Sequence, residues 1–222
     1  MKLSAILGAA ALSLSMLPMG ASAATLDFNV SDDRTIRDSD GNGAGDALLS
    51  QIDGFLRTFG TTQFWRSVIE FDLSGLGATV TSATLSLTDQ GTSRDGRIDI
   101  YGFSGDGIVS VDDADVLAMQ VGSIEIVEAD GTQQFEIDVT AFLQSLTDVD
   151  ASHAGFILAS ESPSFSVGGS DICSSEFSNC APKLVAEVTE APEVAPIPLP
   201  AGLPLLLAGI GGLALLRRKA TR

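Results

Sequence analysis

The stretch WRSVIEFDL, residues 65–73, decides the fold class of this chain. Along it, apolar and polar side chains alternate with a period of two, which is typical of a β-strand that buries one face and leaves the other in solvent. We therefore expect a half-buried strand here. Its apolar face would carry Trp65, Ser67, Ile69, Phe71 and Leu73, and its polar face Arg66, Glu70 and Asp72.

The same alternation recurs between turns rich in glycine and aspartate. A single short helix is predicted over residues 139–146, with Thr140 as its N-cap. Many short strands without long helices between them indicate an all-β fold, an antiparallel jelly-roll-like β-sandwich over residues 24–188. The further strands are expected over residues 82–87, 98–101, 124–126, 135–139, 155–159 and 183–188.

Residues 1–23 have the pattern of a secretory signal peptide. Lys2 precedes an apolar run, and the small residues Ala21 and Ala23 form an A-x-A exit. Such a segment directs export and is removed afterwards. We expect delivery by the Sec export machinery and a mature chain that begins at Ala24.

The C-terminal segment, residues 197–222, has the pattern of a membrane-spanning helix. Residues 197–216 hold no charged side chain, and a run of about twenty apolar residues can cross a bilayer. The basic cluster Arg217, Arg218 and Lys219 follows directly and marks the cytoplasmic side. We expect a transmembrane helix, preceded by a polar linker over residues 189–196.

The order of a proline motif, an apolar helix and a basic cluster resembles the VPLPA-CTERM sorting signal of the PEP-CTERM class. This resemblance implies recognition by an exosortase in the inner membrane of a Gram-negative bacterium. Release from the cell or attachment at its surface would follow, and an ordinary membrane anchor is the alternative. The motif consists of Ile197, Pro198, Leu199, Pro200, Ala201 and Gly202, with Ile197 where the family has valine.

The chain is strongly acidic, with 29 acidic and 12 basic residues and a net charge of −17. Five of the basic residues lie in the terminal segments, so the exported part holds all 29 acidic residues against seven basic ones. A phosphate backbone would be repelled, which excludes nucleic-acid binding. This charge suits a solvated secreted surface or one that binds divalent cations.

The two cysteines, Cys173 and Cys180, lie close together in DICSSEFSNC. Outside the cytoplasm such a pair typically forms a local disulfide, with free thiols as the alternative. The C-x6-C spacing without a nearby histidine is poor for zinc.

A series of short segments resembles the DNRLRE-type domain, a jelly-roll β-sandwich of the carbohydrate-binding-module kind. This resemblance covers roughly residues 26–188 and implies contact with extracellular polysaccharide. Two departures are an Asp/Gly insertion before residue 65 and the stretch YGFSGDGIVSVDDADV in place of a tryptophan-bearing strand. The matching segments are RSVIEFDLSGL (66–76), VTSATLSL (80–87), FEIDVTAFLQ (135–144), GFIL (155–158), SSE (174–176) and PKLV (182–185).

Residues 38–46 spell D-x-D-x-N-G-x-x-D and place Asp38, Asp40, Asn42 and Asp46 as candidate calcium ligands. Oxygen side chains at alternate positions, with glycine for the sharp turn, can surround a hard cation. The loop is not an EF-hand, because Leu49 stands at the twelfth position. A surface loop without a metal is the alternative.

A second acidic stretch, residues 105–115, resembles half of a dockerin calcium loop. It offers Asp106, Asp112 and Asp113 as further candidate calcium ligands. Gly102 occupies its first ligand position, so the match is incomplete. A solvated turn is the default interpretation.

The sequence offers little for catalysis, and we expect no enzyme. The only histidine, His153, is predicted to lie in a loop, and no serine elbow is present. Sugar-binding modules present exposed aromatic rings, and Tyr101 is the most plausible such ring. The other aromatic candidates are Trp65, Phe55 and Phe59, and Trp65 is expected in the core.

Together these patterns predict an exported protein of the cell surface or extracellular matrix that contacts carbohydrate and is stabilised by calcium. A structural matrix protein without a ligand and a membrane-anchored hydrolase are the alternatives.

Overall fold

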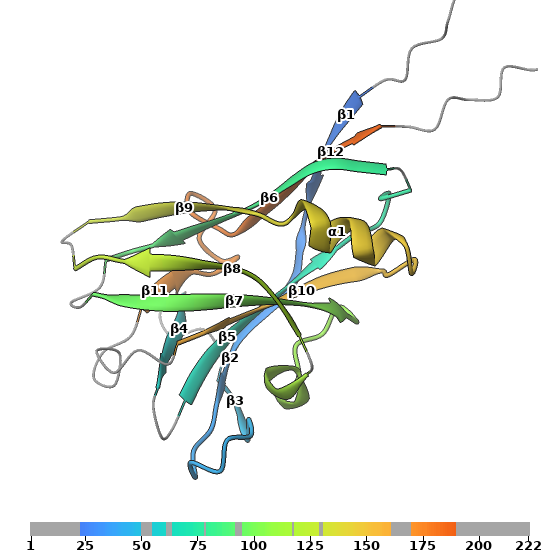
Figure 1. Ribbon diagram of the computed structural model, residues 1–222. Helices are drawn as coiled ribbons and strands as arrows, with labels where there is room; N and C mark the ends of the chain where they lie inside the picture. Colours follow the sequence, from blue (N-terminus) through green and yellow to red (C-terminus); the bar gives the residue numbers. More distant parts are fainter. Residues whose placement is uncertain are drawn as a thin grey trace, which may run out of the picture. The chain divides into compact units, whose positions relative to one another are not determined.

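The computed structural model describes residues 23–49, 55–60, 64–77, 79–91, 95–116, 118–128, 131–160 and 170–189. Within these ranges twelve strands form an antiparallel β-sandwich, which confirms the expected all-β fold (Figure 1). Residues 1–22 of the predicted signal peptide and residues 190–222, with the predicted sorting signal, lie outside the described residues. No helix in the described ranges is long and apolar enough to cross a membrane.

The described chain contains twelve strands, one α-helix and one short 3-10 helix. In order they are β1 (Ala23–Phe28), β2 (Val30–Arg37), β3 (Ala47–Leu49), β4 (Phe55–Gly60), β5 (Phe64–Asp72), β6 (Thr79–Asp89), β7 (Gly96–Gly105), η1 (Val111–Asp115), β8 (Met119–Ile126), β9 (Gln133–Asp138), α1 (Thr140–Thr147), β10 (His153–Ala159), β11 (Ser170–Cys173) and β12 (Lys183–Thr189).

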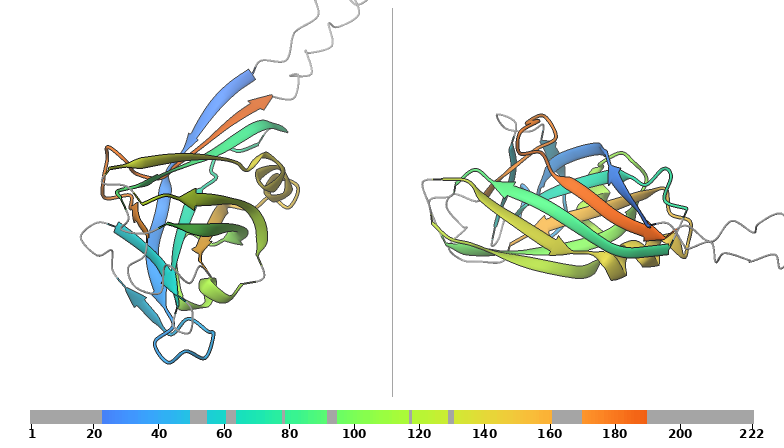
Figure 2. Two further views of the ribbon diagram at one scale, coloured as in Figure 1. Left: turned by 60° about the vertical axis from the view of Figure 1, so that its left-hand side comes forward. Right: turned by 90° about the horizontal axis from the view of Figure 1, so that it is seen from above.

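Two sheets face each other in the sandwich (Figure 2). In the first, β6 pairs with β9 along one edge and with β12 along the other, and β1 pairs with β12. In the second, the order is β8-β7-β10-β5, and β2 pairs with both β5 and β3. Strand β4 pairs with β11 of the first sheet and with β5 of the second, so it joins the two sheets along one side.

The facing sides of the two sheets form the main hydrophobic core. On β6, Ala83, Leu85 and Leu87 are buried, as the alternation predicts. The ring of Phe156 packs edge to face against Phe71 and Phe142, with centroid distances of 5.9 and 5.4 Å. Burial of each such ring contributes on the order of 1.5–3 kcal/mol, so this aromatic cluster is a main source of the fold's stability.

Helix α1 is present as predicted, but Thr140 is not its N-cap. Val139 holds that position, and Thr140 is the first helical residue. The Thr140 hydroxyl accepts a hydrogen bond from the Ala83 amide at 2.9 Å and donates to Asp138 at 2.6 Å. The hydroxyl therefore ties the helix to β6 instead of capping the helix amides.

Strand β5 differs from the expected half-buried strand, because both of its faces are covered. Glu70, expected in solvent, is completely buried, and Arg66 and Asp72 are half-buried. Residues 106–116, which we call the strap, lie over this outer face. Apolar residues of the strap and of the strands that it covers form a second apolar cluster, which consists of Ile36, Val68, Phe103, Val109, Ala114 and Ile157.

Two further sequence expectations have clear outcomes. His153 is not in a loop but is the first residue of β10, where it pairs with Asp72 and Gly105 on the neighbouring strands. The disulfide between Cys173 and Cys180 is confirmed, with a Cα–Cα distance of 5.9 Å. It closes the turn between β11 and β12.

Candidate calcium loop

Residues 38–46 form the connection between β2 and β3. The two strands pair in antiparallel register, and the last pair is Arg37 with Ala47. The Asp46 amide donates to the Arg37 carbonyl at 2.9 Å and closes the loop. Gly41 and Gly43 have φ of +74° and +92°, a conformation that glycine adopts without steric cost. These turns bring the two ends of the loop together.

The carboxylates of Asp38, Asp40 and Asp46 converge in this loop. Ligand oxygens of the three lie within 4.8 Å of one another, and they are the only such group among the described residues. Asp38 is buried, whereas Asp40 and Asp46 are exposed. The structure thus brings together the three carboxylates predicted from the sequence.

Hydrogen bonds within the loop orient these side chains. The Asp38 carboxylate accepts from the amides of Gly41 and Gly43 at 2.6 and 2.9 Å. Both oxygens of Asp46 accept from Ser39, one from its amide and one from its hydroxyl, each at 2.8 Å. The Asp40 carboxylate accepts from Asn42. Each carboxylate oxygen has a further lone pair, so these bonds position the group without exhausting its acceptors.

Asn42, the fourth predicted ligand, is used differently. Its side-chain oxygen accepts the Ala44 amide at 2.7 Å, and its side-chain nitrogen donates to Asp40 at 3.1 Å. The Asn42 side chain therefore fixes the turn and orients Asp40, and its oxygen keeps one further lone pair, as the carboxylate oxygens do.

The electrostatics of Asp38 favour its charged form. Burial opposes ionisation, but the amides of Gly43 and Gly41 donate to the carboxylate and more than offset that cost, so the pKa of Asp38 lies below its usual value. An ionised, buried carboxylate beside two exposed ones attracts a cation. Calcium takes about six to eight oxygen ligands, many of them carboxylate, carbonyl or water, so the loop can supply part of such a shell.

The loop is attached to the strap. The Gly45 amide donates to the Asp115 carboxylate at 2.9 Å, across 70 residues of sequence. A β-carbon on Gly45 would lie 2.7 Å from the Ile36 side chain and 2.9 Å from the Val111 carbonyl oxygen, so only glycine fits this contact. Arg66 in turn holds Asp115 at 3.5 Å and donates to the Ala114 carbonyl at 2.5 Å.

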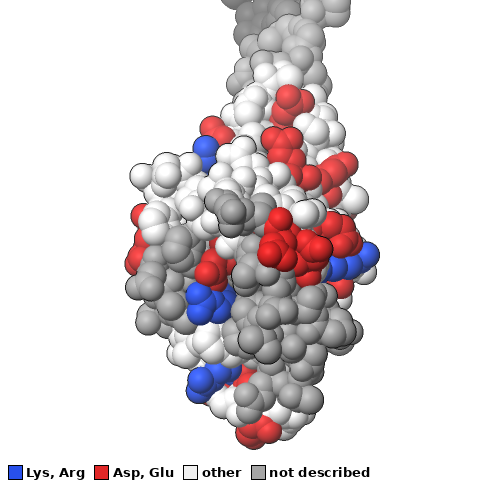
Figure 3. Space-filling model, turned by 90° about the vertical axis from the view of Figure 1, so that its left-hand side faces the viewer, with Lys and Arg blue, Asp and Glu red and all other residues white. Residues whose placement is uncertain are grey.

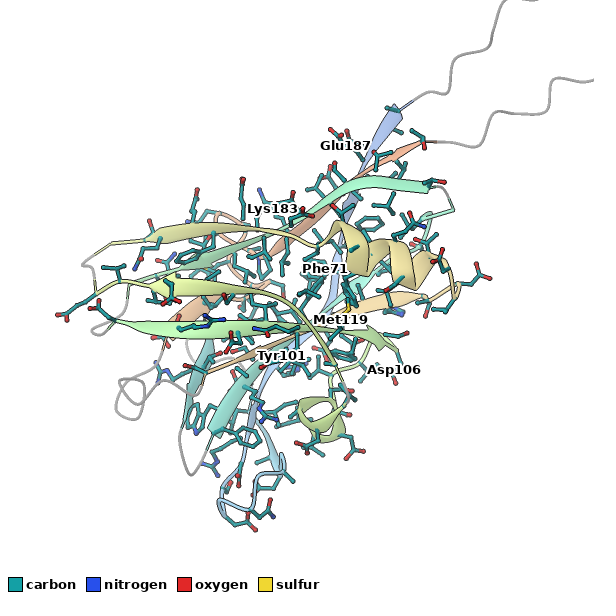
Figure 4. The ribbon with its side chains drawn as sticks, in the orientation of Figure 1. Phe71, Tyr101, Asp106, Met119, Lys183 and Glu187 are labelled. Atoms are coloured by element: carbon teal, nitrogen blue, oxygen red, sulfur yellow. A yellow bond between two sulfur atoms is a disulfide. The ribbon has the colours of Figure 1, made fainter. Side chains whose placement is uncertain are left out.

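The predicted second calcium stretch lies in the strap, and its carboxylates do not converge. Asp106, at the start of the strap (Figure 4), accepts the Ile108 amide at 3.0 Å. Asp113 accepts the Ser110 amide at 2.6 Å, and Asp112 is exposed. Asp106 and Asp113 thus cap turns of their own backbone, and we assign no metal to the strap.

Of the aromatic candidates for sugar contact, Tyr101 is less exposed than expected and Trp65 is more exposed. Tyr101, on β7 (Figure 4), is half-buried and packs against the second apolar cluster. Trp65 is also half-buried rather than in the core. The side chains of Phe55 and Phe59 lie outside the described residues. Acidic side chains outnumber basic ones on the face shown in Figure 3, as the composition predicts.

The sequence did not predict that Glu70, Arg66 and Asp115 are part of the contact between strand β5 and the strap. Glu70 and Arg66 lie under the strap, and Asp115 lies within it. One sequence signal was available: Val68 and Ile69 are adjacent apolar residues on opposite faces of β5, which is typical of a strand covered on both sides. The identity of the covering segment had no comparable signal.

No protein-family model matches this chain, and no curated protein matches it. Among solved structures, it is similar to a cycloalternan-forming enzyme from Listeria monocytogenes in complex with a pentasaccharide, with 14% identity and a TM-score of 0.31. It is also similar to an exo-β-1,3-galactanase from Phanerochaete chrysosporium, solved with β-1,3-galactotriose and with galactose, with 10% identity and TM-scores of 0.31 and 0.30.

The matched regions cover 73% of this chain for the first enzyme and 75% for the second. The chain spans only 11% of the length of the first enzyme and 29% of the second. Overlap at such TM-scores is too low to transfer an activity from these enzymes to this chain.

Proposed function

We propose that this chain is an exported, non-catalytic β-sandwich that binds calcium in residues 38–46 and contacts polysaccharide outside the cell. The observation that carries the proposal is the convergence of Asp38, Asp40 and Asp46 within 4.8 Å. Carboxylates this close repel one another in water, and a divalent cation turns that repulsion into attraction.

The exposure of Asp40 and Asp46 gives the cation a second role. A calcium ion on this loop would face solvent on one side and keep water among its ligands. Hydroxyl or carboxylate oxygens of an acidic polysaccharide can replace such waters. The ion would therefore bridge an acidic protein to an acidic polymer, which the protein's own charge would otherwise repel. The resemblance to DNRLRE-type jelly-roll domains supports this glycan role.

The proposed location rests on the termini and on the disulfide. A signal peptide over residues 1–23 and a VPLPA-CTERM-like segment over residues 197–222 support export by Sec and processing by an exosortase. The disulfide between Cys173 and Cys180 suits an oxidising compartment. We therefore assign the protein to the cell surface or the extracellular matrix, with an inner-membrane intermediate.

Thermal unfolding with calcium and with excess chelator tests the metal site. At free calcium of about 100 times the Kd, binding to the folded state alone stabilises it by about 2.7 kcal/mol. For a domain of this size that raises the Tm by about 5 to 11 °C. Asp40→Asn should abolish this rise, because it removes one of the three carboxylates. The variant should still fold, because Asp40 is exposed and its described contacts are confined to the loop.

Asp27→Asn is the matched control, since Asp27 is an exposed aspartate on β1, away from the loop sequence. It should keep the full calcium response. A Tm that is the same in calcium and in chelator would exclude the metal site. A rise that Asp40→Asn leaves intact would place the ion elsewhere.

The glycan role is tested separately, by the binding of a polyuronate such as alginate and of a neutral glucan. We expect alginate binding that requires calcium and is lost in Asp40→Asn. If neither polymer binds in either condition, the chain is a structural matrix protein without a glycan ligand.

A further inference from the structure

Glu70 is buried in a way that its sequence position does not explain. The residue is 0% exposed. Its Oε1 atom is the only buried side-chain nitrogen or oxygen in the described part of the chain that has no hydrogen-bond partner. Buried polar atoms are nearly always paired, so an unpaired carboxylate oxygen points to a protonated or switchable group.

The other oxygen of Glu70 holds the strap. Oε2 accepts the Gly107 amide at 2.5 Å, across 37 residues of sequence. A β-carbon on Gly105 would lie 2.5 Å from Oε2, and one on Gly107 would lie 2.7 Å from the His153 ring. The start of the strap is therefore packed directly on the Glu70 carboxyl and on His153.

The neighbouring strand holds the next part of the strap in the same way. Asp32 on β2 lies opposite Glu70 in the ladder, and its carboxylate accepts the Val109 amide at 3.1 Å. Arg34 pairs with Asp32 at 3.0 Å and so balances its charge. No arginine or lysine pairs with Glu70 among the described residues.

The ionisable groups around Glu70 come from every element packed on it. On its own strand lies Asp72, on β2 Asp32 with Arg34, on β10 His153, and in the strap Asp106 and Asp113. Burial raises the pKa of Glu70, the Gly107 amide lowers it, the charges of Asp113 and Asp106 raise it, and His153 lowers it. The net direction is upward.

We propose that the strap is an acid-closed cover, held down when Glu70 is protonated and loosened when Glu70 ionises. In the closed form the neutral carboxyl accepts the Gly107 amide and buries no charge. When the proton leaves, an unpaired buried charge faces Asp106 and Asp113, and lifting the strap restores its hydration. The lifted strap uncovers Val68, Phe103 and Ile157 of the second apolar cluster.

The direction in which closure of the strap depends on pH follows from proton linkage. The closed state binds this proton more tightly than the open state, in which the pKa of Glu70 returns toward 4.5, the ordinary value of a solvated glutamate. Closure is therefore complete below about pH 4.5 and weakens as the pH rises through the raised pKa of the closed state. For each unit by which closure raises the pKa, opening becomes up to about tenfold more favourable.

Hydrogen exchange of the full chain in mild detergent and chelator measures this opening. The exchange rates of the Gly107 and Val109 amides are divided by those of unstructured peptide at each pH, from about pH 4.5 to about pH 8. We expect their protection to fall with rising pH in the wild type. In Glu70→Gln, which is neutral throughout, it should stay high and flat.

Two variants separate Glu70 from other acids and from histidine. Glu136→Gln makes the same change at an exposed position on β9 and should behave like the wild type. In His153→Gln, the protection of the same two amides should still fall with rising pH. The proposal is overturned if amide protection in the wild type does not change with pH, or if its pH dependence persists in Glu70→Gln.

A second measurement decides the question if Glu70→Gln does not fold. In the wild type, the Glu70 carboxyl carbon and the Gly107 amide proton should titrate in NMR spectra with one midpoint above pH 4.5. Two separate midpoints, or a Glu70 midpoint at or below this value, would contradict the switch. Because chelator is present throughout, failure here leaves the calcium proposal untouched.

Discussion

The two acidic loops of this protein look alike in sequence and differ in structure. Both hold several aspartates, and Gly45 of one contacts Asp115 of the other. In residues 38–46 the carboxylates converge on one point. In the strap, by contrast, Asp106 and Asp113 cap their own backbone, and the strap residues Val109 and Ala114 are buried against the sheet.

The difference teaches that acidic composition alone does not identify a cation site. The connection between β2 and β3 is a hairpin, and its closing pair forces Asp38 and Asp46 together. The strap instead crosses a sheet face. Burial of its apolar residues fixes the path of its backbone, and that path sets where its carboxylates lie. Three predictions test this distinction, in order of expected effect.

Gly105→Ala should damage the strap most. The new β-carbon would meet the completely buried Glu70 carboxyl at 2.5 to 2.9 Å, so the Glu70 side chain or the strap must shift. Overpacking of this kind costs about 2 kcal/mol, or about 4 to 8 °C in Tm, measured by thermal unfolding near neutral pH.

Two glycine controls sharpen this result. Gly77→Ala should be nearly neutral, because no atom lies within 4 Å of the new carbon. Gly43→Ala, in the calcium loop, should lower the stability of the fold by about 1 kcal/mol because of its positive φ. Equal Tm values for Gly105→Ala and Gly77→Ala would show that Glu70 does not pack under the strap.

Arg66→Lys should have a smaller effect that reaches both loops. The Arg66 guanidinium binds the Ala114 carbonyl and Asp115 and lies 3.9 Å from the centroid of the Phe64 ring. Lysine keeps the charge but not the planar fork, at a cost of about 1 kcal/mol.

The Gly45 amide, which donates to Asp115, reports whether a change at Arg66 affects the calcium loop. Faster hydrogen exchange of that amide in Arg66→Lys would show that the strap supports the calcium loop. Arg97→Lys, at a side chain that is 50% exposed, should change stability by less than about 0.5 kcal/mol. If Gly45 exchange is unchanged in Arg66→Lys, the two loops are energetically independent.

The smallest expected effect is an acid dependence of opposite sign in the calcium loop. Because the pKa of Asp38 is lowered, its contribution to stability is present above 3.8, the ordinary value of an aspartate, and is lost as the pH falls through the lowered value. Glu70 has the reverse sign, since its contribution is lost as the pH rises.

The Gly43 amide, which donates to Asp38, is the local probe for this dependence. Its protection from exchange should fall in acid, and Asp38→Asn should remove that fall. A local probe is needed because hydrogen bonds from Ser74 and Thr140 also lower the pKa values of Asp72 and Asp138. A Gly43 amide that stays protected in acid would contradict the assignment.

Much of the sandwich could be predicted because strand alternation is a local property. Ala83, Leu85 and Leu87 are buried as their spacing predicts, and β10 and β12 lie where expected. The strands before residue 64 and β11 were not predicted. In β2 the buried residues include Asp33 and Thr35, so the apolar alternation that marks the other strands is absent.

The candidate calcium loop was predictable for a related reason. Its candidate ligands lie within nine consecutive residues, and glycine turns in the same stretch bring them together. The hydrogen bonds of Asn42 were not predictable, because they depend on the turn that actually forms.

The sequence by itself determined the all-β class, the local disulfide and the cluster of Asp38, Asp40 and Asp46, since each depends on residues close together in the chain. The tertiary structure alone decided which polar side chains lose contact with water. Glu70 and Glu136 both stand at polar positions of an alternating strand pattern, yet Glu70 is buried and Glu136 is exposed. The physical reason is that burial of an outer sheet face depends on a segment that returns over it, here across 37 residues of sequence, and no periodicity within the strand encodes that return.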